Sequence, residues 1–235
     1  MTDSRKRYEA WHAALPVDLA VEAPWHLLVL AHLNPTDDLQ DRDVLELACG
    51  RGGFARHLVT LARPRRLVAE DFETAAVRMG HATGTRLRGL HWVGGDAQAL
   101  PHPDASFDTI ISCETIEHVP DPGQAVREFA RVLRPGGRLF LTTPNYLGGF
   151  GVYRLYRWAT RRPYTEEGQP INHVMHWFRI VRALRRAGLR ARVLDGIGHY
   201  LPIPRRAPLR LLTLDGMRWL TRWTALHAFV LAEKP

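Results

Sequence analysis

Short apolar runs alternate with longer segments of helical spacing over the first 150 residues. Five runs have the length and apolar character of buried strands in a parallel sheet. These predicted strands are residues 44–47, 66–70, 90–93, 109–112 and 138–143. The segments between them predict helices at residues 54–61, 73–81 and 120–132. This alternation is typical of an α/β sheet with helices on both faces.

The two ends of the chain follow different patterns. Residues 5–33 and 171–187 predict helices, whereas residues 192–197 and 226–231 predict two last strands that pair antiparallel. Between these strands, leucine and tryptophan recur at helical spacing over 208–223, with arginines at other positions. A basic amphipathic helix of this kind either lies at a membrane interface or packs on its own domain.

The strongest local signal is the run 43–56, which reads DVLELACGRGGFAR. Its apolar strand leads into a turn with Gly50, Gly52 and Gly53, and then into a helix from Phe54. Glycine lets the backbone of such a turn approach a ligand closely. In open α/β sheets this corner binds ligands at the carboxyl ends of the strands.

Two classes of cofactor use such a corner. Residues 50–55 fit the dinucleotide pattern G-x-G-x-x-G/A, and Asp71 follows Gly52 by 19 residues, near the acidic position of that pattern. Glu46 separates the classes, because a carboxylate just before the turn repels a pyrophosphate. It attracts the sulfonium and ammonium groups of S-adenosylmethionine. The sequence therefore favours S-adenosylmethionine.

Residues 44–52, VLELACGRG, resemble the first motif of the class I S-adenosylmethionine-dependent methyltransferases, in particular the type 11 and ubiquinone-biosynthesis O-methyltransferases. That motif normally reads Val-Leu-Asp/Glu-x-Gly-Cys-Gly-x-Gly, so Ala48 replaces a glycine. The resemblance continues in order to about residue 146. It implies a Rossmann-like seven-stranded sheet of order 3-2-1-4-5-7-6, whose last strand is antiparallel.

The resemblance also implies roles for individual residues. Asp71 would accept hydrogen bonds from the ribose hydroxyls, and Phe72 would lie against the adenine. Asp96 would accept a hydrogen bond from the adenine amino group, and Ala97 would supply a backbone N–H. The other cofactor-binding residues expected are Tyr8, Trp11, Glu46, Ala48, Gly50, Gly52, Phe54, Cys113 and Glu114. For Tyr8 and Trp11, packing on the domain is an equal alternative.

Histidines provide the candidate catalytic base. A hydroxyl that accepts a methyl group benefits from a base, and histidine is the usual one. His118 follows the fourth strand, on the edge that would face the cofactor. His173 and His176 stand before the next predicted helix, and His12 lies in the N-terminal segment.

Glu114, Glu117 and His118 allow a metal site as an alternative. They resemble a loop of the ubiquinone-biosynthesis O-methyltransferases in which carboxylates and a histidine are associated with a divalent metal. The same Glu-His sequence occurs in relatives without metal, where it forms a hydrogen-bonding pair. We expect no bound metal, with these three residues as the alternative ligand set.

Composition places the chain in a broad class. Its 235 residues, 46% of them apolar, suffice for one α/β domain. No window of 18 uncharged apolar residues predicts a transmembrane helix, and the N-terminus lacks a signal-type apolar segment. Cys49 and Cys113 do not form a disulfide framework, and we expect buried thiols in a reducing cytoplasm.

Charge is distributed unevenly. The net charge is +8, and residues 151–235 hold 16 basic against 5 acidic side chains, or +11. This excess indicates an anionic substrate, a membrane surface or nucleic acid, or else merely solvated helices.

We expect one methyltransferase domain with a helical cap at 1–40, a cofactor-binding core at 41–146 and a substrate cover at 147–172. Residues 173–235, with the basic helix at 208–223, complete it. The predicted function is O-methylation of a small phenolic or hydroxylated metabolite or a lipid, with peripheral contact at the inner membrane face. RNA methylation is one alternative. A non-catalytic or NAD-binding protein is the other.

Overall fold

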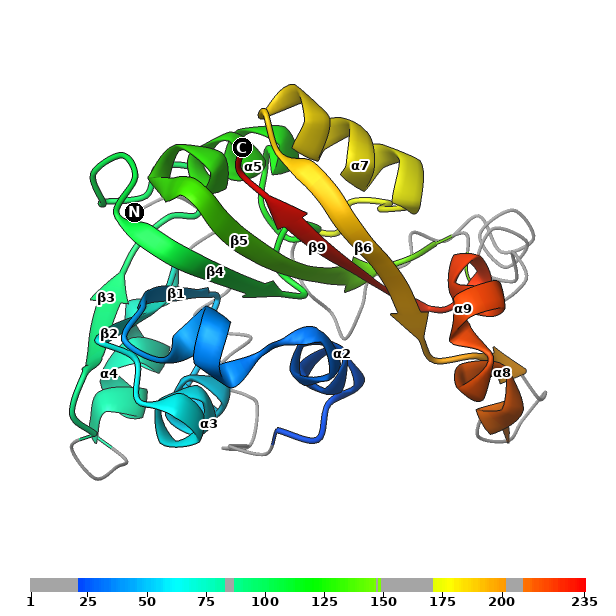
Figure 1. Ribbon diagram of the computed structural model, residues 1–235, viewed down its shortest axis with the longest axis horizontal. Helices are drawn as coiled ribbons and strands as arrows, with labels where there is room; N and C mark the ends of the chain where they lie inside the picture. The colour runs from blue at the N-terminus through cyan, green and yellow to red at the C-terminus, as the bar shows by residue number, and fades with distance from the viewer. Residues whose placement is uncertain (1–20, 83–86, 147, 149–170, 202–208) are drawn as a thin grey trace.

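The centre of the molecule is a seven-stranded sheet of order β3-β2-β1-β4-β5-β9-β6 (Figure 1). The computed structural model describes residues 21–82, 87–146, 148, 171–201 and 209–235. The strands are β1 Asp43–Leu47, β2 Arg66–Asp71, β3 Leu90–Gly94, β4 Phe107–Cys113, β5 Leu133–Pro144, β6 Arg190–Ile197 and β9 His227–Glu233. β9 is antiparallel to both β5 and β6. The expected order and the antiparallel last strand are confirmed.

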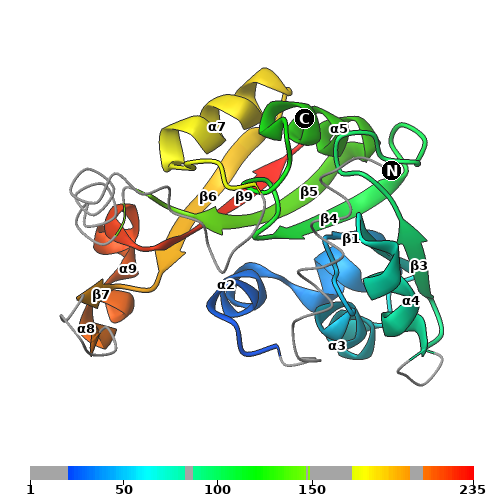
Figure 2. The ribbon, with the colours of Figure 1, turned by 180° about the vertical axis from the view of Figure 1, so that it is seen from behind.

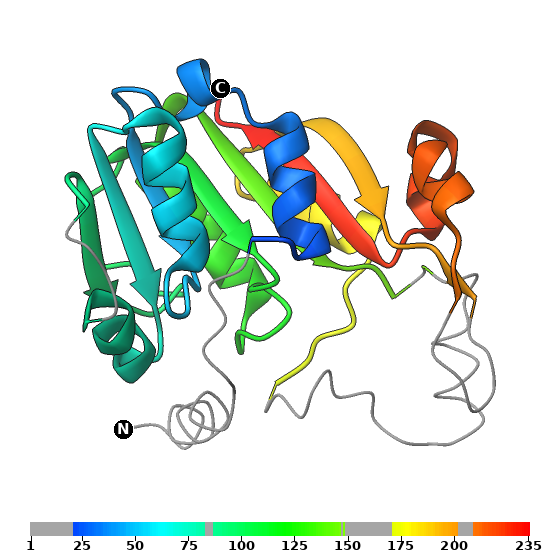
Figure 3. The ribbon, with the colours of Figure 1, turned by 90° about the horizontal axis from the view of Figure 1, so that it is seen from below.

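Helices cover both faces of this sheet. Seen from below, α2 and α3 lie across one face (Figure 3), and α5 and α7 lie on the other (Figures 1 and 2). The helices are α2 Pro24–His32, α3 Gly53–Ala62, α4 Thr74–Ala82, α5 Pro122–Val132 and α7 Trp177–Arg186, with a π-helical turn η1 Pro35–Leu39. The helices predicted between the strands are therefore present.

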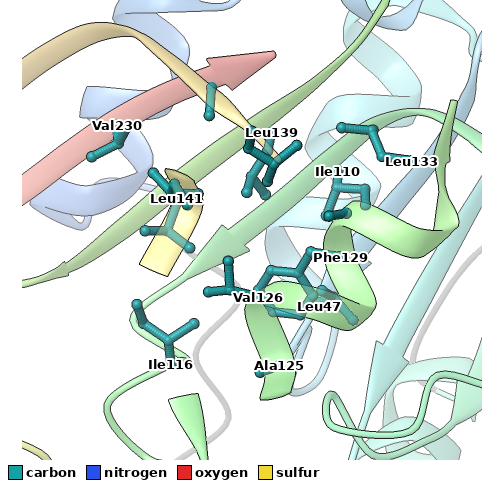
Figure 4. Packing of buried hydrophobic residues seen from close by; sticks show 14 of the residues in the cluster. Leu47, Ile110, Ile116, Ala125, Val126, Phe129, Leu133, Leu139, Leu141 and Val230 are labelled. Atoms are coloured by element: carbon teal, nitrogen blue, oxygen red, sulfur yellow. The ribbon is translucent and has the colours of Figure 1, made fainter. Parts of the chain in front are cut away.

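Each face of the sheet buries its own hydrophobic cluster. Leu47, Ile110 and Leu139 point from the strands toward Val126 and Phe129 of α5 (Figure 4). On the other face, side chains of α2 and α3 pack on the same strands. β1 is buried at all five positions, which explains why it is apolar without alternation.

An ion-pair network closes the amino edge of the sheet. Asp43, at the start of β1, accepts hydrogen bonds from Arg65 at 2.5 Å and from Arg134 at 2.8 Å. Arg134 also pairs with Asp108 at 2.7 Å, and Asp108 accepts from the Asp43 backbone N–H. Although burial raises the pKa of Asp43, the hydrogen bonds from Arg65 and Arg134 outweigh it, so its pKa lies below the usual value.

Three helix predictions need correction. The helix expected over 5–33 is not continuous, because the backbone of Ala23 is not helical and this residue is the N-cap of a helix that begins at Pro24. The helix expected from residue 171 begins only at Trp177, because His176 is its N-cap and the residues before it are extended. The continuous helix expected over 208–223 is wrong. This stretch contains a short strand β8 Leu209–Arg210, the short helices α8 Leu212–Gly216 and α9 Arg218–Thr221, and a 3-10 turn η4 Arg222–Thr224.

The break within 209–224 has a local cause. Asp215 accepts hydrogen bonds from the backbone N–H groups of Gly198 and His199, at 2.9 and 3.2 Å. These bonds fix α8 against the end of β6, and Gly216, a poor helix former, ends α8. β8 pairs with the short strand β7 Tyr200–Leu201.

Candidate active site

The carboxyl ends of four strands meet at one edge of the sheet. β2 ends at Asp71, β1 at Leu47, β4 at Cys113 and β5 at Pro144. Pro144 is paired with His227, the first residue of the antiparallel β9, so the beginning of β9 lies at the same edge. The loops that follow these strands therefore converge there, as in other open α/β sheets.

The two glycines of the turn after β1 serve different purposes. Gly50 has a φ of +53°, and nothing lies within 4 Å of the position a Cβ would take. Gly52, the N-cap of α3, has a φ of +73°, and a Cβ there would lie 2.1 Å from the Trp92 ring. Gly50 thus leaves the backbone open to a ligand, whereas Gly52 makes room for a side chain of β3.

The backbone conformation of Ala48 shows why glycine is usual at this position. Its φ is +54°, a left-handed conformation that costs a non-glycine residue about 1–2 kcal/mol. The residue is exposed. The chain therefore keeps the backbone shape of the turn with a less suitable residue.

Glu46 is a buried carboxyl beside this turn. It is 5% exposed, and its Oε2 atom has no hydrogen-bond partner among the described residues. Burial, together with the nearby charge of Asp71, raises its pKa to about 8. An unpaired buried carboxyl is costly to a fold, so its presence indicates a cationic ligand group.

Asp71 is held at the end of β2 by the turn itself. One of its oxygens accepts from the Gly50 N–H at 2.7 Å and the other from the Glu73 N–H at 2.8 Å. A carboxylate oxygen can accept more than one hydrogen bond. Asp71 is therefore fixed where the sequence predicted a ribose-binding carboxylate.

The loop after β3 holds the predicted adenine-binding residues. Asp96 Oδ1 accepts from the backbone N–H of Gln98 at 2.9 Å, which shapes the loop into an Asx-turn. Gln98 in turn accepts from the Asp121 N–H at 2.8 Å, so the loop is tied to the start of α5. Phe72 is half-buried beside this edge, and Ala97 packs against the core.

The Phe54 ring and the Cys49 thiol are buried, and Cys113 is half-buried. The Phe54 ring is 3% exposed and stacks on His26, with centroids 4.3 Å apart. Cys49 and Cys113 are free thiols. Burial raises the pKa of both, as do Asp71 for Cys49 and Glu46 for Cys113, so both stay protonated near neutral pH.

The loop after β4 is anchored by Glu117 and His118. Glu117 is fully buried, and its Oε2 accepts from the Thr143 hydroxyl at 2.8 Å. The Nδ1 atom of His118 lies 2.8 Å from the Ile171 carbonyl, and its Nε2 lies 3.5 Å from Glu117 Oε1. Burial lowers the pKa of His118, which favours the neutral ring. Both ring nitrogens of His118 thus face protein atoms.

His173 and His176 differ sharply in their surroundings. The backbone N–H of His173 donates to the Glu117 carbonyl at 2.7 Å, which places it against the loop after β4. Its Nε2 atom is buried and has no hydrogen-bond partner in the described part of the chain. His176 instead accepts from the Arg179 N–H as the cap of α7. His12, Tyr8 and Trp11 lie outside the described residues.

A further histidine reaches this edge that local sequence patterns did not single out. His227, at the beginning of β9, has its Nδ1 3.4 Å from Glu114 Oε2. Trp25 packs its ring 5.5 Å from that of His227. Glu114 has a φ of +47°, a strained conformation for a residue with a side chain. Only the pairing of β9 with β5 brings these residues together, so no local signal could have found the pair.

The alternative metal ligands do not gather around one point. Glu117 faces Thr143 and His118, whereas Glu114 faces His227. Across the described ranges, no three histidine, cysteine or acidic side chains are arranged to hold a metal ion.

Comparison with known proteins agrees with this geometry. Residues 45–141, which span β1 to β5, match the family model described as a methyltransferase domain. This part of the chain is similar to S-adenosylmethionine-dependent methyltransferases. This matched range includes the glycine turn, Glu46, Asp71 and the loop after β4. Relatives that are similar over this range are named as S-adenosylmethionine-dependent enzymes.

Several mycobacterial methyltransferases are similar over this part of the chain. A probable S-adenosylmethionine-dependent methyltransferase of Mycolicibacterium smegmatis is 41% identical over 44% of this chain and 38% of its own length. The phthiotriol/phenolphthiotriol dimycocerosates methyltransferase of Mycobacterium tuberculosis is 36% identical over 52% of this chain and 46% of its own length. A fatty-acid O-methyltransferase of M. smegmatis is 36% identical over 46% and 40%. The chain thus spans less than half the length of these relatives.

Solved structures show the same fold over nearly the whole chain. The putative methyltransferase of Haloferax volcanii, solved with the Trm112 methyltransferase activator, has a TM-score of 0.71 at 24% identity and covers 99% of this chain and 98% of its own. A methyltransferase of Mesorhizobium loti has a TM-score of 0.65 at 18% identity, with 91% and 99% covered. At these identities the likeness concerns the fold alone.

Proposed function

We propose that the protein transfers the methyl group of S-adenosylmethionine to a hydroxyl of a small hydroxylated metabolite or a lipid. The observation that carries the proposal is Glu46, a buried carboxyl with an unpartnered oxygen next to the open turn at Gly50. When bound, the cofactor supplies an electrophilic methyl carbon. The protein supplies position, charge and a proton acceptor.

The residues present fit this cofactor. Glu46, when ionised, attracts the ammonium group of its methionine part. Asp71, fixed at the end of β2, offers acceptors for a ribose diol. Phe72, Asp96 and Ala97 would contact the adenine. Cys113 and Glu114 continue the same edge at the end of β4.

His173 is the side chain that we assign as the proton acceptor. A base needs a ring nitrogen able to reach the acceptor hydroxyl. The Nε2 atom of His173 has no partner among the described side chains, whereas the nitrogens of His118 face Ile171 and Glu117. His118 then acts as a positioning residue that holds residue 171 and the loop after β4 together.

The relatives support a hydroxylated lipid as the acceptor class. One is named a fatty-acid O-methyltransferase and others are named for phthiotriol dimycocerosates. These names describe those proteins, and the matched region is mainly the cofactor-binding part. A lipid acceptor also agrees with the exposed apolar side chains near the carboxyl edge described below.

Cofactor binding can be tested without an acceptor. Calorimetric titration with S-adenosylhomocysteine should give saturable binding, and NAD should give none. Asp71→Asn should weaken the binding at least tenfold while the circular dichroism spectrum stays unchanged. Asp104→Asn, an exposed carboxylate remote from this edge, is the matched control. Binding of NAD in preference to S-adenosylhomocysteine would overturn the proposal.

A further inference from the structure

Large apolar side chains face outward on the segment from α8 to η4. Trp219 is 69% exposed, Leu212 66% and Leu220 56%. We call these three residues, with Met217 and Trp223, the apolar patch. A helix that packed on its own domain would bury such side chains. Exposed groups of large apolar residues mark interaction surfaces.

Asp215 and Thr221 of the same segment are bonded to the buried His199. His199 is 1% exposed, and its ring nitrogens lie 2.9 Å from Asp215 Oδ1 and 3.0 Å from the Thr221 carbonyl. The Thr221 hydroxyl donates to the Leu214 carbonyl at 2.7 Å. These bonds fix α8 and α9 with their polar side on β6, so the exposure of the apolar patch is built into the fold.

The patch lies beside the carboxyl edge. Asn145, directly after β5, donates from its side chain to the Trp223 carbonyl at 3.0 Å. The ring of Trp223 packs against Trp177 at 5.4 Å, at the start of α7. Figures 1 and 2 show α8 and α9 at the end of the molecule opposite α4. A partner on the patch would therefore stand next to the acceptor side of the site.

The charge of the segment points to the chemistry of that partner. In the sequence of the described segment 209–222, three residues are arginine and one is acidic, Asp215. Asp215 is turned inward onto His199, so its charge is not presented outward. The guanidinium of Arg222 lies over the Trp223 ring, 5.2 Å from its centroid. Tryptophan, leucine and arginine together are typical of segments that lie in the interface of an anionic bilayer.

We propose that the apolar patch docks the protein on an anionic phospholipid surface, which the positive charge of this part of the sequence favours. Docking would present the carboxyl edge to an acceptor held in the membrane. No helix in the described segments has the length and apolar character to cross a bilayer, so contact of this kind would be peripheral. The inference concerns binding and does not depend on methyl transfer.

Vesicle co-sedimentation tests the proposal with the full chain. The wild type should bind vesicles of phosphatidylcholine with phosphatidylglycerol at least tenfold more tightly than vesicles of phosphatidylcholine alone. The double variant Trp219→Ser, Leu220→Ser should lose at least tenfold in that binding. Leu61→Ser removes a 42% exposed leucine from α3, at a distance from the patch, and should bind like the wild type.

Three outcomes would overturn the proposal. They are no binding of the wild type to anionic vesicles, equal binding by the double variant, and a stable dimer that the double variant abolishes. The last would assign the patch to a second copy of the chain, and light scattering at matched concentration detects it. Titration with S-adenosylhomocysteine on the same samples shows whether the cofactor site is intact, so failure of docking and failure of the proposed function are distinguishable.

Discussion

The single residue that most constrains the chemistry is Glu46. Its pKa of about 8 means that it carries a proton at pH 7 in the free protein. A cationic ammonium beside it favours the ionised form. Cofactor binding and the loss of this proton are therefore linked.

This linkage makes a quantitative prediction. At pH 7, binding of S-adenosylhomocysteine, which carries the same ammonium group, should release about one proton. Its affinity should rise from pH 6 to pH 8 and then level off. Calorimetry in two buffers of different ionisation enthalpy measures the released protons. Glu46→Gln should bind at least tenfold more weakly and with no dependence on the buffer. Proton release that persists in this variant would contradict the assignment.

Glu46 also affects stability with a definite sign. A raised pKa in the folded state means that stability falls as the pH rises from about 4.5 through about 8. Glu46→Gln removes this loss, so the variant should be more stable than the wild type at pH 9. The two proteins should be equally stable below pH 4.5. Urea unfolding at the two pH values measures the difference, and a variant that is less stable at pH 9 would contradict it.

His173 carries the second prediction at this scale. His173→Asn should lower methyl transfer about 100-fold at saturating cofactor, because a general base contributes at least this much. The affinity for S-adenosylhomocysteine should stay unchanged. His176→Asn is the control, since His176 caps α7 and should affect mainly stability. Equal losses in both variants would remove His173 from the role of base.

At the scale of elements, the two glycines of the turn between β1 and α3 have different roles. Gly50 leaves room for a ligand, and Gly52 leaves room for the Trp92 ring. Gly50→Ala meets no atom, so its cost should be the left-handed conformation alone, about 1–2 kcal/mol. Gly52→Ala adds a collision with Trp92 and should cost at least about 3 kcal/mol. Denaturant unfolding measures the free energy of unfolding of both variants. Gly50→Ala should also weaken cofactor binding although the protein stays folded, because its side chain stands where the cofactor approaches the backbone. Equal free energies of unfolding would contradict the distinction.

The elements of the core could be predicted from the sequence because their signals are local. β1, β2 and β3 are short apolar runs, and α3, α4 and α5 have clear helical spacing between them. Outside the core, hydrogen bonds determine where the helices begin and end. Asp215 accepts hydrogen bonds from Gly198 and His199 and so fixes α8 against the end of β6. His176 is the N-cap of α7, which therefore begins six residues after the predicted start.

The residues of the site could be predicted where a motif surrounds them. Glu46 lies within a strand that the sequence identifies, Asp71 lies at the end of the next strand, and Asp96 lies two residues beyond the third. The contacts that only the assembled sheet creates could not be predicted. His227 reaches Glu114 across 113 positions of chain, and Trp92 enters the space left by Gly52.

At the scale of the whole molecule, the amino edge of the sheet contributes stability and the carboxyl edge holds the candidate active site. The amino edge is closed by the pairs of Asp43 with Arg65 and Arg134. Because the pKa of Asp43 is lowered, this stabilisation is present above pH 4 and is lost as the pH falls through the folded-state pKa. The carboxyl edge instead holds the buried Oε2 of Glu46, which has no partner among the described residues, and the strained backbone of Ala48 and Glu114.

Asp43→Asn tests the amino edge. The variant should be less stable by about 2 kcal/mol at pH 7, because hydrogen bonds to charged partners are lost. The difference should disappear in strong acid. Asp104→Asn, whose carboxylate is largely exposed beside Arg131, should cost less than about 1 kcal/mol. Thermal unfolding at pH 7 and in strong acid measures both, and a loss for Asp43→Asn that persists in strong acid would contradict the role of the ionised carboxylate.

The central claim is methyl transfer to a hydroxylated small molecule or lipid. The most direct measurement incubates the protein with S-adenosylmethionine labelled in its methyl group and with a fractionated extract, and counts label in the lipid, water-soluble, RNA and protein fractions. We predict label in the lipid or water-soluble fraction, and loss of that label in the variants His173→Asn and Glu46→Gln. Label confined to RNA or protein, or no label despite measured cofactor binding, would contradict it.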